Sequence, residues 1–384
     1  MVEKYSFSKI SVKFIFVLIN TKVGEVLLKE RIFRYMYKFK MGFLIDRNVF
    51  IFQKLKNKLV SSELEVKNGE NGISYVSFGD VDMANCLQVL LNRNHQEKIQ
   101  PIRCYSELYS NVEKVKEDCK LYNCKKIFFA GENLIPYIKH NTLILNDYAF
   151  YNHVNYRIKN YSEYLLDDVD LALGFAEIDN SKYMRFPGWI LYNGFFSICD
   201  SYNEIQRKVR NINAARSSCL KECICINSHD AFGFRTKIAD DLNGILDITY
   251  AGKWRNNTSE LWDKYENDKL KYMNLFRFNI CPENMDAPHY CTEKIFDSFR
   301  AGCIPIYAGA LNNPEPDVIN KDAVIFWNLD GDNTDNIKLI KKLNTDDNFY
   351  NKFLQQEKLL PSAAEYVYDR FIKLENKFRE ILDD

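Results

Sequence analysis

The sequence of 384 residues has no excess of charge of either sign and no long apolar stretch. Its 52 lysines and arginines match its 52 aspartates and glutamates, so the composition favours no nucleic-acid partner. The longest early apolar run, Phe14 to Ile19, is too short for a membrane span or a signal peptide core, and no small-residue cleavage site follows it. We therefore expect a cytoplasmic protein without a transmembrane segment or signal peptide.

Several common signatures are also missing. The sequence has no G-x-S-x-G, no Walker loop, no G-x-G-x-x-G and no internal repeat, which removes the usual indications of a serine hydrolase, a P-loop enzyme and a dinucleotide-binding protein. Its eleven cysteines are odd in number and irregularly spaced, and we interpret them as reduced core residues. Cys219, Cys223 and Cys225, with His229 nearby, fit no standard zinc spacing.

The most informative stretch, FRFNICPENMDAPHYCTEKIFDSFRAGCIPIYAGA, runs from Phe276 to Ala310. Its pattern predicts a strand that Pro282 ends, a polar loop, and a helix with Thr292 as N-cap and Gly302 at its end. A short apolar run then predicts a second strand, parallel to the first. The helix should bury Ile295, Phe296 and Phe299.

Three polar side chains fall where this helix begins, at Tyr290, Glu293 and Lys294. The loop and the free N–H groups at such a place form a natural anion site. The lysine suits a phosphate, and the glutamate suits hydroxyl groups of a ribose or sugar. The alternative is a capped surface helix with solvated charges.

This stretch resembles the donor-site signature of glycosyltransferase family 10, the α-1,3/4-fucosyltransferases. The matching residues are Glu283-Asn284, Tyr290 to Lys294, and Ala301-Gly302 through Pro305 to Gly309. Pro282 and Cys291 depart from the family pattern, and neither is a charged position.

A second motif, IFFAGEN, places Glu132 just beyond a predicted strand, Lys126 to Ala130. On the residues alone it is a loop acid; the resemblance implies that it is the general base. Val169 to Phe175 and Tyr183 to Pro187 are similar to later family motifs, and an insertion from Pro136 to about Asp167 separates them from Glu132. Acceptor identity therefore cannot be carried over.

A further β-α-β unit is predicted from Cys223 to Gly252, with Arg235 in the first turn of its helix. A positive charge there is unfavourable unless an anion lies nearby. The residues alone favour a surface arginine, whereas the resemblance implies a cation for the nucleotide diphosphate. Three D-x-D strings begin at Asp80, Asp168 and Asp330; such pairs can hold a divalent ion, but they arise easily by chance in an Asp-rich chain.

We expect residues 1–190 to form an acceptor-side α/β domain, 191–220 a linker, 221–345 a donor-binding α/β domain with a strand at Ala323 to Trp327, and 346–384 C-terminal helices. Residues 1–70 have the least distinct secondary-structure pattern. The basic, aromatic stretch from Glu25 to Lys58 could rest on an anionic membrane surface as a peripheral contact, or be a solvated helix face.

The resemblance implies a GT-B-like fold, in which two Rossmann-type α/β domains face each other across a cleft. It also implies inverting transfer of L-fucose from GDP-β-L-fucose to a hydroxyl of an oligosaccharide acceptor. Glu132 would be catalytic, the donor would bind Arg235, Asn284, Tyr290, Glu293 and Lys294, and no metal or other cofactor would be required, although a divalent metal could stimulate the reaction. The alternatives are a transferase for another nucleotide sugar and a non-catalytic nucleotide-sugar-binding protein. The oligomeric state is left open.

Overall fold

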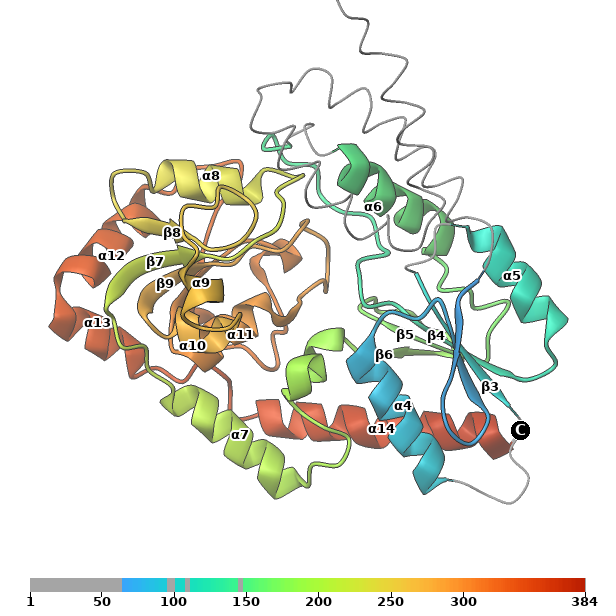
Figure 1. Cartoon of the computed structure of the whole chain (residues 1–384). Helices are drawn as coiled ribbons and strands as arrows, with labels where there is room; N and C mark the ends of the chain where they lie inside the picture. The colour runs from blue at the N-terminus through green and yellow to red at the C-terminus, as the bar shows by residue number, and fades with distance from the viewer. Residues whose placement is uncertain (1–63, 95–100, 108–110, 144–147, 384) are drawn as a thin grey trace, which may run out of the picture. The chain divides into compact units, whose positions relative to one another are not determined.

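The computed structural model describes residues 64–94, 101–107, 111–143 and 148–383, which belong to one compact unit. Figure 1 shows that unit as two sheets surrounded by helices. The basic stretch from Glu25 to Lys58 lies outside the described residues. No helix in the described ranges is both long enough and apolar enough to span a bilayer.

The first sheet has six strands, which follow one another in sequence order. All neighbouring pairs are parallel except the first. The strands are β1 (Val66–Asn68), β2 (Ile73–Val76), β3 (Ile102–Ser106), β4 (Lys125–Phe129), β5 (Leu171–Gly174) and β6 (Tyr183–Arg185).

Helices cover both faces of this sheet. The side chains of β4 point alternately to the two faces and so contribute to the core on each of them. Ile127 and Phe129 pack in one core with α4 (Val81–Arg93). Phe128 packs on the opposite face with α5 (Val112–Leu121) and stacks on Tyr161 of α6 (Tyr148–Tyr161). The insertion predicted at residues 136–167 therefore includes a helix packed on the sheet.

The second sheet is entirely parallel, in the order β11-β10-β9-β7-β8. Its strands are β7 (Lys221–Cys225), β8 (Ile248–Tyr250), β9 (Phe276–Ile280), β10 (Ile304–Tyr307) and β11 (Ile325–Phe326). The surrounding helices are α8 (Phe234–Asp241), α9 (Glu260–Asp263), α10 (Lys269–Met273), α11 (Glu293–Ala301), α12 (Thr334–Thr345) and α13 (Asp347–Leu354). The described ranges also contain short 3-10 turns, which are η2 (Gly188–Ile190), η3 (Tyr192–Gly194), η4 (Ala310–Asn312) and η5 (Lys321–Ala323).

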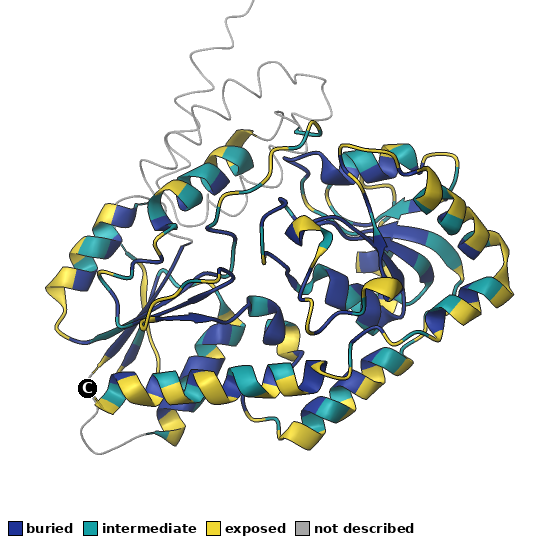
Figure 2. Cartoon of the chain, turned by 180° about the vertical axis from the view of Figure 1, so that it is seen from behind, coloured by how far each residue is buried: buried dark blue, intermediate teal, exposed yellow. Residues whose placement is uncertain are grey.

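Two further helices run beside each other, α7 (Tyr202–Ala214) and α14 (Ala363–Asp383). A capping box between Ser201 and Glu204 starts α7. The buried side of α14, visible in Figure 2, carries Phe371, Leu374 and Phe378 into the core that also holds α4. The chain's last helix thus returns to the first sheet.

The structure confirms the strand, helix and parallel strand predicted from Phe276 onward, as β9, α11 and β10. Gly302 ends α11 at φ 81°, where an added Cβ would lie 2.2 Å from the carbonyl carbon of Arg216. Thr292 is the N-cap of α11 as predicted, although its side chain makes no cap hydrogen bond. The strand expected at Ala323 to Trp327 is shorter, because η5 occupies its first residue.

Candidate active site

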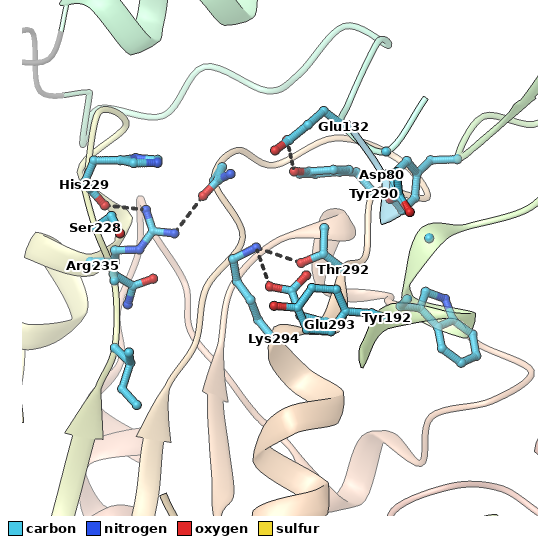
Figure 3. A pocket seen from close by; sticks show the side chains of 17 residues that line it. Asp80, Glu132, Tyr192, Ser228, His229, Arg235, Tyr290, Thr292, Glu293 and Lys294 are labelled. Atoms are coloured by element: carbon cyan, nitrogen blue, oxygen red, sulfur yellow. Dashed lines mark hydrogen bonds and ion pairs between the residues drawn. The ribbon is translucent and has the colours of Figure 1, made fainter. Parts of the chain in front are cut away.

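A cavity of about 340 Å³ lies at the carboxyl ends of both sheets, where α/β proteins build their sites. All six side chains predicted from the sequence border it, as Figure 3 shows for five of them by name. They are Glu132, Arg235, Asn284, Tyr290, Glu293 and Lys294. Glu132 follows β4 of the first sheet, and the other five follow β7 or β9 of the second.

Glu132 is held by Tyr290, whose phenol donates a hydrogen bond of 2.8 Å to its Oε2 atom. Tyr290 is fully buried. Burial, and then the charge of Glu132, hold the pKa of Tyr290 well above its ordinary value, so the phenol keeps its proton. Tyr290 was predicted to line the donor pocket, and it also orients the proposed base.

Arg235 is 2% exposed and is already oriented toward the cavity. It donates to the carbonyl of His229 (3.0 Å) and to Oδ1 of Asn284 (2.9 Å). Its Nε atom has no hydrogen-bond partner in the described part of the chain. The carboxylate of Asp230 lies 3.7 Å from Nη1 and accepts backbone N–H groups of α8, which accounts for a positive charge in that first turn.

Lys294 donates from Nζ to Oε2 of Glu283 (3.0 Å) and to the hydroxyl of Thr292 (2.7 Å), and lies 3.9 Å from Glu293. Burial alone would lower the pKa of Lys294, but the Glu283 and Glu293 carboxylates outweigh it and the pKa lies above its usual value. The ammonium therefore stays charged. Since it has three donors, one remains for a ligand in the cavity.

Glu283 was not among the predicted site residues, although it belongs to the quoted motif. It is fully buried and accepts hydrogen bonds from the backbone N–H and the hydroxyl of Thr292 and from the phenol of Tyr307. Gly309 packs against it, because a Cβ there would lie 2.8 Å from Glu283 Cβ and Cγ. The motif thus encodes the support of Lys294 as well as the lysine itself.

Other lining residues were missed, among them Asp80, Trp189, Tyr192, Ser228 and His229. Asp80 is the N-cap of α4 and accepts the N–H of Met83. The sequence drew attention to Asp80 only as part of a D-x-D string, which arises easily by chance, and to His229 only beside cysteines that fit no zinc spacing.

Each D-x-D string contains an aspartate that accepts a hydrogen bond from a backbone N–H group. Asp82 accepts the N–H of Asn193, Asp170 accepts that of Lys126, and Asp332 accepts that of Thr334. The described ranges contain no group of three or more His, Cys, Asp or Glu arranged to hold a metal ion. All eleven cysteines are free thiols.

The segment after Glu132 is fastened to the second sheet's loops. Ile138 forms a bridge with Asp286, whose loop also carries Asn284. The ring of His140 lies between the Asp286 carboxylate (3.0 Å) and the Asp330 carboxylate (2.7 Å). These contacts link the chain around the proposed base to the loop around the proposed donor site.

Two α/β sheets with a shared pocket at their carboxyl ends are the architecture of a GT-B-type glycosyltransferase, and the comparisons confirm the predicted fold. Two solved α1,3-fucosyltransferase structures match with TM-scores of 0.52 and 0.55, at 21% and 20% identity, covering 85% of this chain and 95% and 94% of theirs. The first of them contains GDP-fucose.

The resemblance to glycosyltransferase family 10 is confirmed as well: residues 216–372 match the family model described as glycosyltransferase family 10 (fucosyltransferase) C-term and form a domain of that family. The α-(1,3)-fucosyltransferase FucT of Helicobacter pylori is 28% identical over 296 residues, covering 68% of this chain. The chain spans about half of that relative, 54% of its length.

Proposed function

We propose that the protein is an inverting fucosyltransferase, which transfers L-fucose from GDP-β-L-fucose to a hydroxyl group of an acceptor glycan. The finer assignment is α-1,3 transfer to a GlcNAc-type sugar. One observation carries the proposal: a carboxylate from the first sheet, Glu132, and two cations from the second, Arg235 and Lys294, border one cavity. The family match and the fucosyltransferase relatives support this donor.

In the proposed reaction, Glu132 takes the proton of the acceptor hydroxyl while the oxygen of that hydroxyl bonds to C1 of fucose. The bond from C1 to the phosphate oxygen breaks on the opposite side, and its electron pair leaves with GDP, which inverts the anomeric centre. Arg235, Lys294 and the N-terminus of α11 stabilise the departing diphosphate. Glu293 holds ribose or fucose hydroxyls, with Asn284 and Tyr290 at the pocket wall.

This assignment needs no metal ion, since the two cations supply the charge that the leaving group requires. The prediction is tested by measuring turnover in EDTA and again after adding Mg²⁺ or Mn²⁺. Turnover that persists in EDTA supports it; turnover that depends on the added ion contradicts it.

The donor is tested by thermal stability with GDP, UDP, CMP and GDP-fucose. A ligand at about a hundred times its dissociation constant should stabilise the fold by roughly 2.7 kcal/mol. Stabilisation by GDP and GDP-fucose alone supports the proposal, and stabilisation by UDP favours the transferase of another nucleotide sugar.

The base is tested with Glu132→Gln, which should keep GDP-fucose affinity and lose turnover by about 10²–10⁴-fold. Glu117→Gln, at an exposed position of α5, is the matched control. Donor binding without turnover in the unaltered protein would favour the non-catalytic alternative.

We also propose a cytoplasmic enzyme whose basic stretch, Glu25 to Lys58, contacts anionic membrane surfaces. The stretch has nine lysines and arginines against few acids. Sedimentation with vesicles containing phosphatidylserine, but not with neutral vesicles, would support this; equal sedimentation with both would refute it.

A further inference from the structure

Two carboxyl groups that line the cavity, those of Asp80 and Glu132, lie near a third, that of Glu107, which is not among the lining residues. A Cβ added to Gly131 would lie 3.5 Å from Oδ2 of Asp80 and 3.9 Å from Oε1 of Glu107, and the next residue is Glu132. Glu107 directly follows β3, whose Ser106 pairs with Phe129 of β4. Neighbouring strand ends therefore bring Glu107 beside the proposed base.

Glu107 and Arg157 are buried and incompletely paired. Glu107 is 1% exposed and Arg157 is 3% exposed. Oε2 of Glu107 and Nε of Arg157 have no hydrogen-bond partner among the described residues. Arg157 belongs to α6, in the insertion that the family motif spacing lacks. Buried, unsatisfied polar atoms are costly, so their presence beside a candidate active site calls for a functional explanation.

Three neighbouring carboxyl groups do not all ionise in a buried setting, because like charges repel. Glu132 accepts a hydrogen bond from the Tyr290 phenol, and Asp80 accepts one from the N–H of Met83, although burial has the larger effect on Asp80 and raises its pKa. Glu107 is the most buried of the three and its Oε2 has no donor. Glu107 is therefore the group that keeps a proton.

We propose that Glu107 and Arg157 are positioning residues of the transfer reaction, which keep Glu132 ionised and ready to accept the acceptor's proton. This rests on the proposed function. Glu107 contributes by staying neutral, and Arg157 contributes a positive charge that favours the Glu132 carboxylate.

The charges around this pair agree with the assignment. Burial raises the pKa of Glu107 to about 8, the charges of Glu132 and Asp80 raise it as well, and Arg157 opposes them. His153 of α6 faces Arg157 and Glu132, and burial, then Arg157, lower its pKa. Tyr164 also faces Glu107, and burial raises its pKa to about 12.

The test is the pH profile of kcat/KM for four proteins: unaltered, Glu107→Gln, Arg157→Gln and Arg157→Lys. We expect a step near pH 8 in the unaltered protein that Glu107→Gln removes without moving the acidic limb. Arg157→Gln should move that limb to higher pH by roughly one unit, and Arg157→Lys should restore it. His153→Gln identifies any part of the limb that belongs to the histidine.

A merely structural role would lower kcat/KM by one factor at every pH in all three variants, and that result would overturn the proposal. So would a step near pH 8 that survives Glu107→Gln. Urea unfolding from pH 5 to 9 gives a second measurement that needs no activity.

The expected sign of the change in stability with pH follows from the raised pKa of Glu107. The stability that its protonated form contributes is lost as pH rises through about 8. The unaltered protein should therefore lose stability relative to Glu107→Gln over that range. An unaltered protein that makes no fucosylated product yet shows this loss refutes the proposed function while confirming the charge arrangement. A flat stability difference in an active enzyme refutes the charge arrangement alone.

Discussion

Glu315 offers the sharpest test of how the two sheets are held around the site. Its carboxylate is 2% exposed and pairs with Arg185, which belongs to the family-like motif at Tyr183 to Pro187 and is 6% exposed. Arg185 donates to both carboxylate oxygens, at 2.7 and 3.2 Å. The indole of Trp189 (3.1 Å) and the phenol of Tyr366 (3.2 Å) complete the set of donors.

Replacing Glu315 by glutamine keeps the shape but leaves the Arg185 guanidinium buried without its counter-charge. The nearby Glu177 carboxylate is 61% exposed, so solvent screens it and it compensates little. Breaking a buried pair by removing one partner costs about 3–5 kcal/mol. We expect Glu315→Gln to lower the free energy of unfolding by that amount, measured by urea denaturation.

The double variant Arg185→Met with Glu315→Leu should recover most of the loss, since apolar side chains often replace a buried pair with little cost. Asp335→Asn is the control, because its pair with Lys338 is exposed at 96% and 71%, and its effect should stay within about 0.5 kcal/mol. A loss below about 1 kcal/mol in Glu315→Gln, or a double variant no more stable than the single one, would refute the reasoning.

Three other substitutions have definite expected outcomes. Burial and a neighbouring carboxylate raise the pKa of Asp297 to about 6, so wild-type stability is lost as pH rises through that value; Asp297→Asn should be more stable by on the order of 2 kcal/mol at pH 7, with the difference fading toward pH 4 in urea titrations. Gly309→Ala combines a positive φ of 140° with a contact of 2.8 Å to Glu283, and should destabilise the fold and weaken GDP binding in calorimetry, whereas Gly244→Ala, with a positive φ and open space, should only destabilise it. His140→Ala removes the ring between two carboxylates and should cost about 1 kcal/mol in urea denaturation; no change would show that this clamp is dispensable.

The sequence predicted the central β-α-β unit well because its signals are local. Alternating apolar residues, Pro282 and Gly302 each act within a few residues of their own position. Long-range packing gives no such signal, so the return of α14 to the first sheet was not foreseen. The strand expected at Ala323 to Trp327 is shorter than predicted for a related reason. Asn320 caps a short turn by accepting the N–H of Asp322, and that turn includes Ala323.

The six candidate residues were predicted by motif, and the structure brings them to one cavity, yet the motif could not say what holds each one. Arg235 contacts Asn284 only because the ends of β7 and β9 are neighbours in the sheet, whereas the partner of Lys294, Glu283, belongs to the same motif.

The insertion shows the limit most clearly. Nothing in its sequence pairs Arg157 with Glu107, because they are fifty residues apart and come together only when α6 packs on the sheet beside the end of β3. A family pattern transfers the residues that relatives share. The charges around the proposed base in this chain include those of a helix that the family pattern lacks, so they become apparent only in the folded structure.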